Sequence, residues 1–428
     1  MRRYFIGSRA DLSAMACYGR GMTGLSLGPL GLLLLVACLI AMVTRKLGLP
    51  YIVGLVVAGF LIALLPNAPL LPLSRDLIFN VLLPPLVFEA ALQLDWKRFR
   101  HELPLTLTLA FLGVGIATAV VAGGMHYLAG WSWIGAALFG VLIAATDPVS
   151  VIAAFREMGC TPRVSMVVES ESLLNDGVAA VGFAVLSAIA AGASPSAASI
   201  VPAFAWTLAG GLLIGLLVSG AILLIVGRTD DPLVEITLTA IAAYGSFLIA
   251  EEFHASGIIS ALTAGLLAGS VGTRFLSRDG RERIGHAWEF FAFLANSIVF
   301  ILIGMNVADQ PLRALGSTAA MVAILLVLAG RCISIYPLAA LFARSRWRLP
   351  ASFQHTLFWG GLRGALALAL ALAVPTTVPE RDAIILTAFV VVAFSILVQG
   401  LTMPWLIRRF GLGRKAPVEA VAAPEPGR

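Results

Sequence analysis

Eight residues of the sequence, ESESLLND from Glu169 to Asp176, hold three carboxylates within a largely apolar run. In a helix, Ser172 lies one turn before Asp176. Glu171 lies one turn before Asn175 on the adjacent row, so the four side chains share one face. Serine and asparagine alone would fit hydrogen bonding between helices, but two carboxylates on the same stripe favour a functional site.

A second polar interruption, AATDPVS from Ala144 to Ser150, divides another apolar run. Pro148 cannot donate a backbone hydrogen bond, and its ring obstructs the carbonyl one turn earlier, so the helix is expected to break near Ala144. Thr146 and Asp147 would lie at the break, where freed carbonyls and a carboxylate suit a hard cation. The alternative is a simple proline kink with a capping aspartate.

A third site is FWGGLRGALALAL, where Gly360, Gly361 and Gly364 flank Arg363 and weaken the helix. Arg331 also falls within an apolar run. A cation in such a position costs at least about 2.5 kcal/mol unless it is paired or reaches water. Buried acids are therefore the expected partners of both arginines.

Two further acids lie within apolar runs. Glu89 follows the Pro84–Pro85 pair, which distorts its helix, and this makes it the better candidate for an ion pathway. Glu289, in HAWEFFAFLANSIVF, lies nearer a helix end, and an anchoring role is favoured for it.

The composition is that of a membrane protein. The 428 residues have a mean hydropathy of +0.96 and only 12% charged residues, about half the share in soluble domains. The four cysteines have no metal-ligand spacing and are read as packing residues. The basic residues do not cluster as a nucleic-acid patch, so the lipid bilayer is the expected surrounding.

Apolar runs of membrane-spanning length predict thirteen helices. The expected spans are 28–44, 51–66, 77–94, 103–128, 132–155, 163–191, 198–227, 232–250, 256–272, 286–307, 313–343, 352–374 and 382–407. The second is short enough to be tilted or partly re-entrant.

The basic residues of the joints predict the orientation. Alternate joints hold fifteen lysines and arginines, whereas the intervening joints hold three. The positive-inside rule puts the richer joints and the C-terminus in the cytoplasm, and an odd span count then puts the N-terminus outside.

Two tails flank the transmembrane domain expected over 28–410. The N-terminal tail, 1–27, contains four arginines, which an external tail does not favour, and translation from Met22 would remove this conflict. The C-terminal tail, 411–428, is rich in proline and alanine and is expected to be disordered.

The two expected helix breaks lie seven spans apart, in the fifth and twelfth spans. This spacing predicts two inverted six-helix repeats, spans one to six and eight to thirteen, with broken helices that cross near the middle of the membrane. The fold class is therefore an all-α polytopic membrane protein.

Five motifs occurring together over residues 28–410 resemble the sodium/proton antiporters of the NhaP/NHE type, in the monovalent cation:proton antiporter family. The motifs are LPPLVFEAAL, ATDPVS, ESLLNDGVA, FILIGM and GGLRGALALAL. In that family the Asn-Asp pair marks the electroneutral branch, which implies this role for Asn175 and Asp176. The resemblance also implies a homodimer in the bacterial inner membrane that serves pH homeostasis.

The resemblance implies further roles. Ser172, Thr146 and Glu89 would approach the transported cation together with Asp176. Glu171 would form a buried ion pair with Arg363, while Asp147 and Arg331 support the site. Ser170 departs from the family pattern, which has glycine there.

The chemistry of one carboxylate agrees with exchange. A desolvated carboxylate holds a proton near neutral pH, whereas a cation favours the ionised form and displaces that proton. With Asn175 neutral, one proton exchanged for one Na⁺ moves no net charge. No cofactor is expected, since the ions are the substrates.

Three alternatives differ in function. A potassium/proton antiporter would use the same oxygen ligands, and lithium is a further candidate ion. A membrane-embedded enzyme is disfavoured because the five histidines include no HExxH motif and no serine partner at matching depth. A passive channel is disfavoured because a titrating carboxylate and a buried ion pair suit alternating access.

Overall fold

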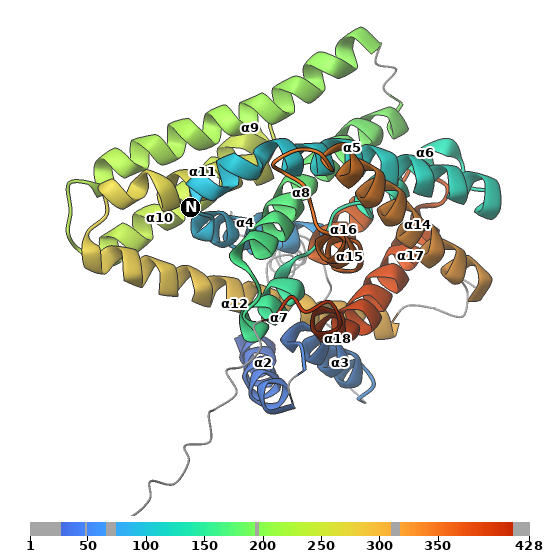
Figure 1. Cartoon of the computed structure of the whole chain (residues 1–428), viewed down its shortest axis with the longest axis horizontal. Coiled ribbons are helices and arrows are strands. Elements are labelled where there is room, and N and C mark those ends of the chain that lie inside the picture. Colours follow the sequence, from blue (N-terminus) through green and yellow to red (C-terminus); the bar gives the residue numbers. More distant parts are fainter. Residues whose placement is uncertain (1–26, 48, 66–73, 193–196, 310–316, 414–428) are drawn as a thin grey trace, which may run out of the picture.

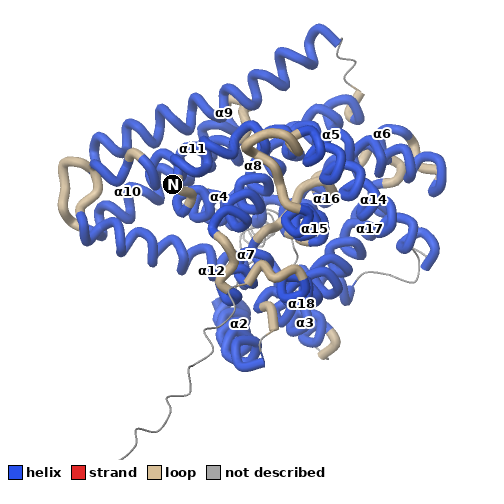
Figure 2. Tube along the Cα trace, in the orientation of Figure 1, coloured by secondary structure: helices blue, strands red, loops and turns tan. Residues whose placement is uncertain are grey.

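The computed structural model describes residues 27–47, 49–65, 74–192, 197–309 and 317–413. Within these ranges the chain is helical and contains no strand (Figure 2). The elements are α2 (Leu27–Leu47), α3 (Tyr51–Ala63), η1 (Leu77–Leu82), α4 (Leu83–Gln93), α5 (Trp96–Ala129), α6 (Trp133–Leu142), α7 (Val149–Met158), α8 (Pro162–Ala190), α9 (Ala197–Val226), α10 (Pro232–Glu252), α11 (Gly257–Ser270), η2 (Gly272–Arg274), α12 (Arg278–Asp309), α14 (Ser317–Leu341), α15 (Ala351–Trp359), α16 (Ala365–Leu372), α17 (Arg381–Phe394), η3 (Ser395–Gly400) and α18 (Leu401–Arg409).

Each of the thirteen expected spans coincides with one helix or with consecutive helical segments. Seven helices in the described part of the chain are long and apolar enough to cross a membrane, and shorter apolar helices accompany them. The prediction of an all-α, multi-pass membrane protein is confirmed. Most of both expected tails lies outside the described residues, as does the proposed start at Met22.

Two helices begin well before the apolar runs that predicted them. Helix α5 begins at Trp96 because Asp95 accepts hydrogen bonds from the backbone of Lys97 and Arg98 and so caps the first turn. Helix α12 begins at Arg278, ahead of its apolar run. Charged residues in the first turn are compatible with a helix, but they lower the local hydropathy, so a search for apolar runs misses that turn.

Two groups of helices lie on either side of α8, and α2 and α3 lie below them in the view of Figure 1. On one side α9, α10 and α11 pack against one another, and α11 also contacts α4. On the other side α5 packs against α6 and α14, while α16 contacts α17. Helix α8 contacts members of both groups and carries the acidic stretch into the centre.

Both predicted helix breaks are present. Helix α6 ends at Leu142 and α7 begins at Val149. Pro148 therefore lies between the two helices, where its ring obstructs no helical hydrogen bond. Helix α15 ends at Trp359 and α16 begins at Ala365, with the glycines between them. The Asp147 N–H donates to the Leu362 carbonyl at 2.7 Å, so the two breaks meet, as two crossing helices require.

Candidate functional site

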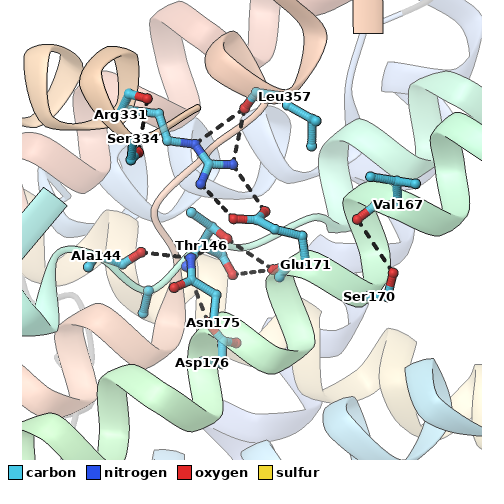
Figure 3. Close-up of polar contacts among 12 residues, drawn as sticks. Ala144, Thr146, Val167, Ser170, Glu171, Asn175, Asp176, Arg331, Ser334 and Leu357 are labelled. Atoms are coloured by element: carbon cyan, nitrogen blue, oxygen red, sulfur yellow. Dashed lines mark hydrogen bonds and ion pairs between the residues drawn. The ribbon is translucent and has the colours of Figure 1, made fainter. Parts of the chain in front are cut away.

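The polar stripe of α8 faces the first break (Figure 3). The Thr146 N–H donates to Asp176 Oδ1 at 3.2 Å, and the Ser172 hydroxyl donates to the Thr146 carbonyl at 2.5 Å. Asn175 Nδ2 donates to the Ala144 carbonyl at 2.9 Å and to Thr146 Oγ1 at 3.2 Å. The predicted common face is therefore confirmed, and its side chains bind the peptide groups that the break exposes.

Asp147 compensates the helix ends that point into the break. Its Oδ1 accepts from the Val149 N–H at 3.0 Å, at the start of α7. Its carboxyl also lies against Gly364, the residue that precedes α16, and a Cβ added there would be 2.3 Å from Asp147 Oδ2. A carboxylate next to two helix N-termini is stabilised by both dipoles, and glycine leaves the space for it.

Arg363 compensates the opposite end of the first broken helix. Its Nη1 donates to the Ala144 carbonyl at 2.7 Å and to the Ala145 carbonyl at 3.0 Å, just beyond the end of α6. A guanidinium at a helix C-terminus satisfies carbonyls that have no intrahelical partner. This explains a buried arginine without assigning it an acid.

Glu171 pairs with Arg331, and the predicted Glu171–Arg363 pair is wrong. Arg331 Nη1 and Nη2 donate to the two carboxylate oxygens of Glu171 at 2.7 and 3.0 Å (Figure 3). Arg331 also donates to the Leu357 carbonyl in the last turns of α15, at 3.3 Å from Nε and 3.1 Å from Nη2. The forked guanidinium of Arg331 thus takes both oxygens of Glu171, while Arg363 is bound to the carbonyls beyond α6.

A cavity of about 70 Å³ lies beside the first break. Asp147 and Asp176 both line it, together with Thr146 and Ser172. Water or a small cation fits such a volume. The oxygen atoms of these four residues are the type of ligand that a hard cation prefers, and the two carboxylates can also take up a proton.

Asn296 also lines this cavity and was missed by the sequence reasoning. It lies on α12, and its side chain is buried. The signal was present, since an amide within FLANSIVF needs a reason in an apolar run. The neighbouring Glu289 drew attention instead, but its side chain is 63% exposed, and its Oε2 lies 3.9 Å from His286.

The predicted approach of Glu89 to the cavity is not observed. Helix α4 lines the cavity through one stripe, which consists of Leu83, Leu86, Val87 and Ala90. Glu89 lies off this stripe, and Gln93 donates a hydrogen bond to its carboxylate. The approach of Glu89 to the cation was implied by the resemblance, and the lining of this cavity does not include it.

Three comparisons with known proteins agree. The sequence profile of the family described as sodium/hydrogen exchanger, transmembrane, matches residues 32–409. The Na⁺/H⁺ antiporter ApNhaP of Aphanothece halophytica is 40% identical over 85% of this chain and 70% of its own length. The Na⁺/H⁺ antiporter NhaP of Pseudomonas aeruginosa is 33% identical over 79% of this chain and 82% of its own.

The fold also matches a solved structure. The sodium proton antiporter MjNhaP1 of Methanocaldococcus jannaschii superposes with a TM-score of 0.72, covering 90% of this chain and 98% of that one. The two sequences are 19% identical, so this likeness concerns the fold.

The buried ion pair yields the first prediction. Arg331→Ala leaves the Glu171 carboxylate without its partner and is expected to lower the free energy of unfolding by roughly 3–5 kcal/mol. The measurement is thermal unfolding of the purified protein in detergent. Adding Glu171→Ala should recover part of the loss, and no recovery would show that Glu171 is not the partner that matters.

The control for this prediction is an exposed pair of similar chemistry. Arg98 lies 3.5 Å from Asp95, with side chains 59% and 53% exposed. Arg98→Ala is expected to change the free energy of unfolding by less than about 1 kcal/mol, because water screens exposed pairs.

A second prediction concerns the glycine beside Asp147. Gly364→Ala places a methyl group where the Asp147 carboxyl lies and should slow ion exchange by up to about 100-fold, the cost of a 1 Å displacement at a reacting group. Gly123→Ala is the matched control, since a Cβ there meets nothing within 4 Å. Equal transport rates in the two variants would contradict the prediction.

Proposed function

Because the chain belongs to the sodium/hydrogen exchanger family, we propose that it exchanges Na⁺ for H⁺ across a membrane, and that Asp176 binds the two ions in turn. The observation that carries this proposal is the position of Asp176. It lies on the cavity, one hydrogen bond from the first break, and a second carboxylate on the same cavity already caps α7.

The balance of charge at the centre of the molecule supports a single exchanging carboxylate. The acids are Glu171, Asp147 and Asp176, and the cations are Arg331 and Arg363. Three carboxylates against two guanidiniums leave one negative charge. In a medium of low dielectric that charge requires a proton or a cation.

Competition for Asp176 is the mechanism. A proton neutralises the carboxylate, whereas Na⁺ binds its ionised form with help from the oxygens of Thr146 and Ser172. Either bound ion gives the site the same net charge. Alternating access then carries one ion in each direction without ATP.

Asn175 makes the exchange electroneutral in this proposal. Its amide nitrogen is used as a donor to the Ala144 carbonyl and to Thr146 Oγ1, so it shapes the break and takes no proton. One proton per Na⁺ follows. A potassium/proton exchanger is less well supported, because the similar proteins are named as Na⁺/H⁺ antiporters.

The setting of the transporter is proposed from the sequence. Residues 28–410 form the transmembrane antiporter domain of a multi-pass protein in the bacterial inner membrane, with a cytoplasmic C-terminus and an external N-terminus. The homodimer and the role in pH homeostasis rest on resemblance. The bound ions are substrates, and the chemistry proposed involves no cofactor and no enzymatic reaction.

The third prediction tests the carboxylate. Asp176→Asn should abolish Na⁺-dependent proton movement in proteoliposomes, because an amide neither titrates nor supplies a negative charge. Glu289→Gln changes an exposed carboxylate on α12 and should retain exchange. Near wild-type exchange in Asp176→Asn would place the site elsewhere, and runs with K⁺ and Li⁺ would settle the choice of cation.

The fourth prediction tests the stoichiometry. Exchange of one proton for one Na⁺ should proceed at the same rate at zero and at large membrane potential, with the potential set by potassium and valinomycin once K⁺ is shown not to be transported. A rate that follows the potential would show that a second acid titrates. Asp147, the other carboxylate on the cavity, would then be the residue to change.

A further inference from the structure

The second helix break is held by the last transmembrane segment. The Ser395 hydroxyl accepts from the Arg363 N–H at 3.0 Å, and its own proton lies within reach of the Val392 carbonyl at 2.9 Å and the Arg363 carbonyl at 3.2 Å. Gln399 Nε2 donates to the Trp359 carbonyl, at the end of α15, at 3.1 Å. Thr402, farther along the same face, accepts from the Trp359 indole at 2.8 Å. One stripe therefore binds both ends of the break.

This stripe begins in a π-helical turn. Segment η3 covers Ser395–Gly400 between α17 and α18, and the side chains of Ser395 and Gln399 are buried there. Insertions of this kind re-aim side chains and occur frequently at functional sites. Here the turn directs a hydroxyl and an amide at peptide groups that no helix satisfies.

The stripe on α8 does the same for the first break. There Ser172 and Asp176 hold the carbonyl and the N–H of Thr146. In both stripes a serine is followed four residues later by a second polar side chain. The segments that carry them are the sixth and the thirteenth, which are equivalent under the seven-span repeat. Ser395 and Gln399 thus parallel Ser172 and Asp176 in their spacing and in binding a helix break.

The second stripe reaches the first through Arg363. Ser395 fixes the backbone of this residue, and its guanidinium donates to the Ala144 carbonyl. Asn175, adjacent to Asp176, donates to the same carbonyl. A shift of the Arg363 peptide would therefore move the guanidinium that orders the break beside Asp176.

We propose that Ser395 and Gln399 are positioning residues of the exchange site, the uncharged counterpart of the Ser172–Asp176 stripe. They touch no transported ion. They hold the α15–α16 break so that Arg363 remains on the carbonyls that follow α6, and this keeps Thr146 and Asp176 in place for the cation. The inference rests on the proposed function, since its consequence is read as cation affinity.

The test compares two variants of equal size. Ser395→Thr keeps the hydroxyl, whereas Ser395→Val removes it, and both add similar bulk at a buried position. Ser395→Val is expected to raise the KM for Na⁺ about fivefold or more, the net worth of one to two hydrogen bonds, while Ser395→Thr stays within about twofold of wild type. Gln399→Met, which removes the amide at similar length, should act in the same direction as Ser395→Val.

Thr387→Val provides the matched control. Thr387 lies on α17, two turns before Ser395, and its buried hydroxyl has no hydrogen-bond partner among the described residues. Ser395→Val should unfold at a lower temperature than Thr387→Val, because it leaves the Arg363 N–H unpaired, and only Ser395→Val should lose affinity and the stabilisation that added Na⁺ gives to the wild type.

Two results would overturn the inference. One is an equal KM in the valine and threonine variants of Ser395. The other is a loss of exchange in Ser395→Val and Gln399→Met that follows loss of thermal stability at unchanged KM. Failure of the proposed function is distinguishable, because the wild type and Thr387→Val would then also show no Na⁺-dependent proton movement.

Discussion

Helices that end inside a membrane leave peptide groups without an intrahelical partner and without water, and each such group costs several kcal/mol if it remains unpaired. Two helices of this protein end in that way at the same place. Polar side chains from three other segments, α8, α14 and α17–α18, supply the missing partners. Six polar residues of these segments are such partners, namely Ser172, Asn175, Asp176, Arg331, Ser395 and Gln399.

The charges follow from the same constraint. Carbonyls at the ends of α6 and α15 attract guanidinium groups, while the N-termini of α7 and α16 attract a carboxylate. Arg331 is paired with Glu171, because a buried cation is tolerated only with a partner. Asp176 has no guanidinium of its own within ion-pair distance in the described structure. The proposed exchange site therefore coincides with the place where the pairing of buried charges is incomplete.

The sequence predicted the features that depend on local chemistry. Pro148 beside polar residues and the three glycines around Arg363 each weaken a helix, so both breaks were predictable, although Pro104 and Pro202 lie inside the unbroken helices α5 and α9. The spacing of Ser172 and Asp176 fixed their common face. The partner of Glu171 was not predictable. Arg331 and Arg363 are both buried cations, and the choice depends on how α14 and the α15–α16 segment are seated against α8. Asn296, the Ser395–Gln399 stripe and Glu89 lie on helices whose rotation about their own axes cannot be read from the sequence.

The two stripes also explain why only one of them carries a charge. The fourth residue after the serine meets different peptide groups in the two halves. At the first break it faces the Thr146 N–H, a donor, for which a carboxylate is a suitable acceptor. At the second it faces the Trp359 carbonyl at the negative end of α15, where a carboxylate has no proton to offer and an amide donates. Gln399 therefore satisfies its break without adding a charge, whereas Asp176 satisfies its break with one acceptor oxygen and retains the negative charge that we propose the proton and the cation share.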